Sequence, residues 1–372
     1  MFDGVQHVER ATVTIDGGTI VAVGEDVPPG VDVIDLGDAA LIPGLVDCHQ
    51  HLCFEALGED AVDTSPEDLA AQARRSARRA VAVGITTIRD LGDRGYATLP
   101  LRDEPGLPTL RCAGPPITVP NGHCWYLGGE VDPALGEAAL RAAVRERIEH
   151  GCDVVKVMVT GGFLTPTNSM WDSQFSFDDV RVIVDEAHQH GRPVAAHCHG
   201  TEGIESAVRA GVDSIEHCSF MDENYSVAPA AELVALVASA NIPISITIGR
   251  LPSLPLAPII AKNVDSIRAV RRTIAELGGV LVPGTDAGIG PAKPHDVLPH
   301  ALSDFVGLGF TPAAGLSAMT ARAAAACGLA ASKGRLAPGF DADLLALRGD
   351  PCNDIDAIHE PVAVWARGER VV

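Results

Sequence analysis

The 372-residue chain lacks the features of membrane, secreted and disulfide-rich proteins. It has no uninterrupted apolar run of about 18 residues, so no segment is expected to span a membrane. Its first residues, Met1-Phe2-Asp3-Gly4, have neither a basic start nor an apolar signal segment. We therefore expect a cytoplasmic protein. Nine cysteines occur without a CxxC pair or a regular spacing, which disfavours a disulfide scaffold.

Positive charge is also scarce. The chain has 28 Lys and Arg against 49 Asp and Glu, a formal net charge of −21. This balance disfavours nucleic acid and anionic membrane surfaces as partners, so we expect a small-molecule substrate. The sequence is compatible with a homo-oligomer. It contains no internal repeat, low-complexity tract or Gly/Ser linker.

Apolar, β-rich runs alternate with amphipathic segments along most of the chain. The expected strands cover residues 41–48, 85–90, 109–113, 154–159, 194–197, 214–217, 242–246 and 280–285. The expected helices cover residues 66–83, 136–150, 178–190, 203–210, 229–240 and 264–277. Eight strands that alternate with helices predict an α/β fold, a (β/α)8 TIM barrel. Its active site is expected at the carboxyl ends of the strands.

The two ends of the chain have a different pattern. Residues 11–15 and 19–23 alternate between apolar and polar types, and Asp16-Gly17-Gly18 between them is a hairpin signal. Similar short runs recur at 342–346 and 363–371. We predict that residues 1–40 and 330–372 together form a small β-sandwich domain, and that residues 41–329 form the barrel.

Two histidines close the first expected barrel strand, in the run Asp47-Cys48-His49-Gln50-His51. Alternate side chains of a strand share one face, so His49 and His51 point the same way. Two imidazoles on one face can hold a metal ion such as Zn, Fe or Ni. Many His-x-His pairs are ordinary packed or surface histidines, so a metal site requires further ligands.

Such ligands occur late in other expected strands. Lys156 lies in the apolar run 153–159, where a lone lysine is costly unless it is paired or modified. His197, His217 and Asp286 each end a different strand. An isolated histidine at such a position is more often a core or surface residue than a ligand. Six residues at consistent strand ends, however, are expected to converge at one mouth of the barrel.

These motifs resemble the amidohydrolase superfamily over nearly the whole chain. Residues 41–51 are similar to its first-strand motif. Four later segments resemble its metal-binding motifs: residues 155–158 followed by Gly161-Gly162, and residues 196–200, 215–217 and 283–286. Residues 334–344 resemble the segment that returns the chain to the β-sandwich. Within the superfamily, the lysine and the Gly-Gly loop look most like the imidazolonepropionase-related group, which includes metal-dependent Xaa-Pro dipeptidases and ochratoxin-type amidases.

The resemblance implies a site with two divalent metal ions, commonly zinc, bridged by a CO2-derived carbamate on Lys156. Besides the carbamate, the implied ligands are His49, His51 and Asp286 for one metal and His197 and His217 for the other. Two adjacent metals lower the pKa of a bridging water, so that hydroxide exists near neutral pH, and polarise the scissile carbonyl. By the same resemblance, Asp286 is the general base for this hydroxide and then the general acid for the leaving nitrogen.

Two further histidines are candidate catalytic residues that stabilise the oxyanion. His123 falls in a Gly- and aromatic-flanked loop after the third strand. His199 lies two residues beyond His197, where the dipeptidases often carry a tyrosine. Loops 160–177 and 249–258 are expected to shape the pocket. Arg89-Asp90 indicates a structural ion pair.

The leading hypothesis is a metal-dependent hydrolase that cleaves the amide bond of an N-acyl amino acid, dipeptide or related carboxamide. The alternative is a deaminase or a cyclic-amide or lactone hydrolase, similar to imidazolonepropionase, with a one-metal site. Lys156 discriminates between them, because a one-metal site needs no bridging carbamate. A third possibility, an inactive scaffold, is disfavoured because all six ligand positions are occupied.

Overall fold

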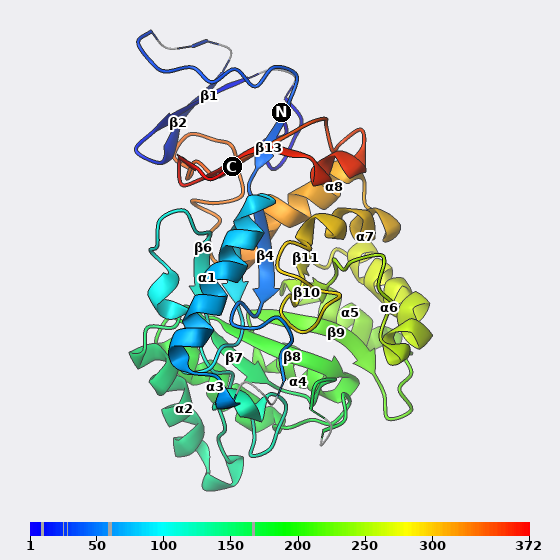
Figure 1. The fold of residues 1–372 in the computed structure, drawn as a ribbon. Coiled ribbons are helices and arrows are strands. Elements are labelled where there is room, and N and C mark those ends of the chain that lie inside the picture. Colours follow the sequence, from blue (N-terminus) through cyan, green and yellow to red (C-terminus); the bar gives the residue numbers. More distant parts are fainter. Residues whose placement is uncertain (9–10, 25, 28, 59–61, 166–167) are drawn as a thin grey trace.

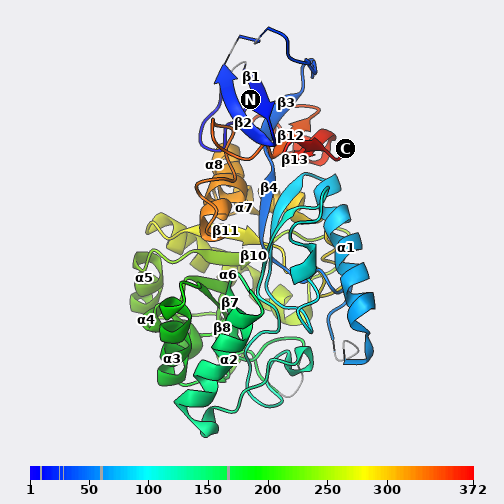
Figure 2. The same ribbon diagram turned by 90° about the vertical axis from the view of Figure 1, so that its left-hand side faces the viewer.

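A computed structural model describes residues 1–8, 11–24, 26–27, 29–58, 62–165 and 168–372. A large barrel carries a smaller β-rich part at one end, where both chain termini lie (Figure 1). The second view shows the same two-part arrangement, with helices around the outside of the barrel (Figure 2). Each helix in the described ranges is too short or too polar to cross a membrane.

Eight parallel strands of the described chain form the barrel. They are β4 (Leu45–Gln50), β5 (Ile85–Asp90), β6 (Thr109–Cys112), β7 (Val155–Met158), β8 (Val194–Gly200), β9 (Ser214–Met221), β10 (Ile244–Thr247) and β11 (Leu281–Gly284). They pair in the orders β4-β5-β6 and β11-β10-β9-β8-β7. Bridges between Gln50 and Ala287 and between Ile117 and Val157 join the two sheets. The TIM-barrel prediction is therefore confirmed.

Helices follow most of the barrel strands and cover their outer faces. They are α1 (Pro66–Ala82), α2 (Glu137–Glu149), α3 (Phe177–Gln189), α4 (Thr201–Ala210), α5 (Ala231–Ser239), α6 (Pro258–Glu276), α7 (Ala301–Gly307), α8 (Pro312–Ser317) and α9 (Ala323–Ala326). The sequence explains several of their ends. Ser65 caps α1 by accepting a hydrogen bond from the amide of Asp68, and Ser176 and Asp179 form a reciprocal capping box on α3.

The first six helices lie where the pattern of the sequence predicts them. The short helices α7, α8 and α9, and the π-helical turn Ala318–Arg322 before α9, were not predicted. Short helices have little intrinsic stability, so packing against the barrel accounts for them. Leu302, Phe305 and Leu316 are buried in the main core.

The smaller part contains a two-stranded and a four-stranded sheet. The hairpin pairs β1 (Thr12–Asp16) with β2 (Thr19–Gly24), and the second sheet has the order β14-β13-β12-β3. The strands of the second sheet are β3 (Ala40–Pro43), β12 (Leu344–Leu347), β13 (Pro361–Ala366) and β14 (Glu369–Arg370).

Antiparallel pairing of β3 with β12 unites the two ends of the chain. Ile20, Leu344 and Trp365 share a separate apolar cluster. This arrangement agrees with a β-sandwich built from both termini. The exact boundaries, 1–40 and 330–372, stay a prediction.

Candidate active site

The first group of possible metal ligands lies at the junction of the first and last barrel strands. Nε2 of His49, in β4, and Nε2 of His51, just after β4, are 3.3 Å apart, as expected for alternate residues that share one face. A carboxylate oxygen of Asp286, just after β11, is 3.4 Å from the first and 3.3 Å from the second. The amide of Asp286 donates to the His49 carbonyl, which fixes the two strands beside each other. Three donor atoms can thus converge on one cation.

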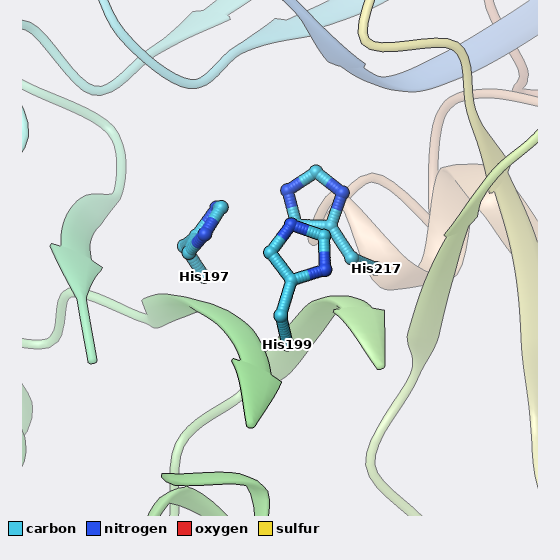
Figure 3. Close-up of side chains that lie close together, drawn as sticks. All are labelled: His197, His199 and His217. Carbon is cyan, nitrogen blue, oxygen red and sulfur yellow. The ribbon is translucent and has the colours of Figure 1, made fainter. Parts of the chain in front are cut away.

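The second group contains three histidines. His197 and His199 come from β8 and His217 from β9, and one nitrogen of each lies within 4.8 Å of the others. The rings of His199 and His217 are stacked at 4.4 Å, and the His197 ring is nearly perpendicular to that of His199 (Figure 3). The sequence predicted His197 and His217 as ligands and His199 as a catalytic residue. In the structure, His199 lies close enough to be a third ligand.

Each of these imidazoles has one nitrogen held by a partner. His51 Nδ1 lies 2.9 Å from the Gly92 carbonyl, and His197 Nε2 lies 3.1 Å from the Gly161 carbonyl. Nδ1 of His199 contacts the Ser219 hydroxyl at 2.8 Å, and Nδ1 of His217 contacts the Thr247 hydroxyl at 3.2 Å. A carbonyl accepts only from N–H, so it leaves the other nitrogen free to bind a metal. Metal-binding histidines are generally held in this way.

Lys156 lines the same cavity as both groups of donors. Its exposed fraction is 1%, and Nζ has no hydrogen-bond partner among the described residues. Burial lowers its pKa, although the carboxylates of Glu216 and Asp286 oppose the shift. A lowered pKa favours the neutral amine, the form that reacts with CO2. A buried, unpaired amine is costly, so the position favours a modified or metal-linked lysine.

Arg89 and Glu216 form a buried ion pair that no local pattern of the sequence indicates. Arg89 was interpreted as an ion-pair partner of Asp90, which is wrong, because neighbouring strand residues point to opposite faces. Instead, Nη2 of Arg89 lies 2.8 Å from Glu216, whose other oxygen lies 3.0 Å from His49 Nδ1. Burial raises the pKa of Glu216, but Arg89 and His49 outweigh this effect and lower it below its usual range. Glu216 is therefore an anion behind His49.

Asp47 is a second missed residue, although it belongs to the first motif. Its carboxylate accepts from the amide of Thr285 at 2.9 Å and from the Thr285 hydroxyl at 2.6 Å. It also accepts from the His49 amide at 3.2 Å and from Gln50 Nε2 at 2.8 Å. Asp47 thus ties β4 to the segment that carries Asp286. Only the tertiary structure could identify it, because Thr285 is 238 residues away in the sequence.

Several donors lie on an unusual backbone. His217, Cys218 and Asp286 have φ values of 67°, 51° and 61°, in the left-handed region that non-glycine residues rarely adopt. Such conformations cost roughly 1–3 kcal/mol each and cluster at functional sites. Cys48 and Cys198, each next to a donor histidine in the chain, are fully buried and pack into apolar clusters.

His123 extends the site beyond the two donor groups. Its ring centroid is 4.6 Å from that of His197, and Nδ1 is 3.1 Å from the Thr165 hydroxyl. Gly162 makes room for the ring, because a Cβ there would be 2.2 Å from His123 Nε2. The Gly-Gly loop noted in the sequence therefore has a steric role.

Most histidines of the cavity favour the neutral state. His51 is the exception: burial lowers its pKa, but Asp286 outweighs this effect and raises it. Burial lowers the pKa of His49 to about 4 and that of His199 to about 3. Burial lowers the pKa of His123 to about 3 as well. Burial raises the pKa of Asp286, but the neighbouring His49 and His51 outweigh it and lower the pKa below its usual range. Neutral imidazoles and an ionised carboxylate are the forms that bind metals.

Four apolar side chains from three loops complete the cavity: Leu57, Phe163, Leu164 and Ile289. Loop 160–177 supplies two of them, so its predicted role in shaping the pocket agrees with the structure. Loop 249–258 supplies none of the described lining residues. Its Leu251 instead lines a separate cavity beside Arg79 and His359.

The amidohydrolase family model matches residues 40–371, and the chain therefore belongs to the amidohydrolase family. Ochratoxinase from Aspergillus niger is 29% identical over 369 residues, which cover 88% of this chain and 75% of the relative. Imidazolonepropionase from Deinococcus radiodurans is 26% identical over 373 residues, which cover 94% of this chain and 88% of the relative.

Solved structures agree with this assignment. A Xaa-Pro dipeptidase with bound methionine in its active site superposes with a TM-score of 0.85 and 29% identity, covering 99% of this chain and 97% of that one. The A. niger ochratoxinase structure has a TM-score of 0.81 and 27% identity, covering 99% and 93%. The chain is thus an amidohydrolase, a hydrolase that acts on carbon–nitrogen bonds.

Proposed function

We propose that this amidohydrolase uses two divalent metal ions, with zinc as the metal, to cleave the amide bond of an N-acyl amino acid, dipeptide or related carboxamide. The observation that carries the proposal is the buried, unpartnered Nζ of Lys156 in a cavity lined by both donor groups. A carbamate at Nζ would replace a costly buried amine with an anion that can bridge two cations. The likeness to ochratoxinase and to a Xaa-Pro dipeptidase supports an amide substrate.

The donor set fits such metals. His49, His51 and Asp286 would hold one ion and His197 and His217 the other, with Lys156 shared as its carbamate. Neutral imidazole and carboxylate suit zinc and related ions. When bound, the metals would supply an acidified water and polarise the substrate carbonyl.

Asp286 has the geometry of a proton carrier in this reaction. Its carboxylate lies within 3.4 Å of both His49 and His51 and borders the cavity. We propose that it takes a proton from the attacking water and delivers it to the leaving nitrogen. His123 and His199 also line the cavity and would donate to the developing oxyanion. The Thr165 and Ser219 hydroxyls orient these two rings.

One observation favours a second candidate function. His197, His199 and His217 form a complete group of three nitrogen donors that does not need Lys156. Three protein ligands with an open fourth position are typical of a catalytic one-metal site. The likeness to imidazolonepropionase agrees with a deaminase or a cyclic-amide or lactone hydrolase of this kind.

Metal content and a substrate screen decide between the two functions. We expect about two metals per chain, a mass increase of one CO2 on Lys156, and hydrolysis of an N-acyl amino acid, a dipeptide or a related carboxamide by the zinc-loaded protein. Lys156→Met should abolish the mass increase and lower the metal content, whereas Lys262→Met, at an exposed position of α6, should change neither. One metal per chain, an unmodified Lys156 and turnover of lactams or lactones alone would favour the second function.

A further inference from the structure

The lining of the active-site cavity separates into a charged floor and an apolar rim. Among the described lining residues, formal charge is confined to Lys156 and Asp286, and both belong to the proposed metal set. The rim is formed by Leu57 and Ile289 on one side and by Phe163 and Leu164 on the other. Residues 59–61 and 166–167, which lie outside the described ranges, contain no lysine or arginine.

The two halves of this apolar rim come from opposite sides of the barrel. Leu57 and Ile289 follow β4 and β11, the first and last barrel strands, and the Leu57 amide donates to the Gly288 carbonyl. Phe163 and Leu164 follow β7, the fourth strand. Strands four and eight face each other across an eight-stranded barrel. A substrate whose amide reaches the donor groups therefore has an apolar surface on both sides.

Phe163 stands out within the rim. Its exposed fraction is 55%, although it is a large apolar residue that lines a cavity. Thr165, two residues further along the chain, is held in place, because its hydroxyl contacts both His123 Nδ1 and the Cys124 amide at 3.1 Å. An anchored loop that holds an aromatic ring at the mouth of a cavity provides a surface for an apolar ligand.

Among the described residues that line the cavity, the rim also offers no cationic partner for a negative group. A carboxylate carried into an apolar surface without a partner loses its hydration and gains nothing in return. The net charge of −21 adds long-range repulsion of anions. From the apolar rim, which has no cation among its described residues, we infer that the preferred substrate is a carboxamide with uncharged apolar groups on both sides of the scissile bond. Phe163 favours this substrate by contact with one of its apolar groups. This inference rests on the proposed amide hydrolysis.

A matched pair of substrates tests the inference. N-benzoyl-2-phenylethylamine and N-benzoylphenylalanine share the same scissile bond and rings, and only the second carries a carboxylate. We expect kcat/KM for the neutral amide to be at least about 10-fold higher with the zinc-loaded protein. Equal or faster hydrolysis of the carboxylate compound would overturn the inference.

Two phenylalanine variants test the role of the rim. Phe163→Ala should lower kcat/KM for the neutral amide by about 10-fold through a higher KM, because the ring no longer covers the substrate. Phe177→Ala, which removes a 41% exposed ring that does not line the cavity, should leave the kinetics unchanged. Unchanged KM in Phe163→Ala would contradict the inference.

Calorimetric binding of both compounds separates this inference from the proposed function. If neither these two compounds nor any amide of the substrate screen is cleaved, amide hydrolysis fails as the function. Tighter binding of the neutral compound, weakened by Phe163→Ala, would still support the apolar rim. Tighter binding of the carboxylate compound would overturn the inference whatever the activity.

Discussion

The carboxylate of Glu216 lies 3.0 Å from Nδ1 of His49, on the side of the ring that faces away from His51. The other carboxylate oxygen contacts Arg89 Nη2 at 2.8 Å, so a buried ion pair supports a histidine of the first donor group. A carboxylate behind a metal-binding histidine fixes its tautomer and raises its basicity. Arg89 in turn donates to the Cys48 carbonyl at 2.7 Å, next to His49 in the chain.

Replacement of Glu216 by Gln should weaken metal binding. Gln can still accept one hydrogen bond, but it carries no charge to balance Arg89 or polarise His49. We expect zinc affinity, measured by competition with a chelator on the folded variant, to fall by about 10- to 100-fold. Glu205→Gln, which removes one partner of the surface pair with Arg209, should leave the affinity unchanged. Wild-type affinity in Glu216→Gln would show that the ion pair has no influence on His49.

Replacement of Asp47 by Ala should destabilise the barrel closure. The substitution leaves the buried amide and hydroxyl of Thr285 without their acceptor. We expect the free energy of unfolding, from urea titration of the metal-free protein, to fall by about 2–4 kcal/mol. Asp35→Ala, at an exposed turn where the carboxylate accepts from the Gly37 amide, should cost less than about 1 kcal/mol. A similar loss of unfolding free energy in both variants would contradict the proposed stabilisation of the β4–β11 contact by Asp47.

The lowered pKa of His199 predicts a pH dependence of stability. The unfolded side chain has a pKa of about 6.5, whereas burial holds the folded pKa at about 3. Below pH 6.5 the unfolded state binds the extra proton, so stability falls as the pH decreases toward the folded pKa. Above pH 6.5 both states are neutral and this contribution is absent.

Variant His199→Gln should flatten this dependence in the metal-free protein. Between about pH 6 and pH 4, we expect the slope of the unfolding free energy to decrease by about 1.4 kcal/mol per pH unit. His150→Gln, at a helix C-terminus on the surface, serves as the control. An unchanged slope in His199→Gln would mean that the folded ring is protonated as readily as the unfolded one.

Replacement of Gly162 by Ala should impair turnover more than folding. The added Cβ would overlap the His123 ring, 2.2 Å from Nε2, and force it away from the cavity. A displacement of about 1 Å can lower kcat roughly 100-fold, whereas metal content should stay at the wild-type value. Gly307→Ala, whose Cβ would meet nothing within 4 Å, is the matched control. Wild-type kcat in Gly162→Ala would exclude His123 from the reaction.

Much of the fold was predictable because its signals are local. Apolar runs predicted all eight barrel strands, and amphipathic runs predicted six helices, two of which begin after the capping residues Ser65 and Ser176. The predicted strand 41–48 is in fact divided: β3 (Ala40–Pro43) pairs with β12, and β4 (Leu45–Gln50) enters the barrel. Gly44 permits this close passage, because a Cβ there would lie 2.1 Å from the Thr86 hydroxyl. Such a contact depends on a residue of another strand, so the hydrophobic periodicity of the segment does not predict it.

The order of strands and helices and the positions of the possible ligands could be inferred from the amino-acid sequence, since both follow from periodicity and from residue type at strand ends. The tertiary structure decided how the ligands are grouped. It placed His199 with His197 and His217, through the left-handed backbone of His217 and the side-by-side packing of β8 and β9. It also brought Glu216 behind His49 across 167 residues of chain. These relationships depend on contacts between distant strands, which local sequence patterns do not encode.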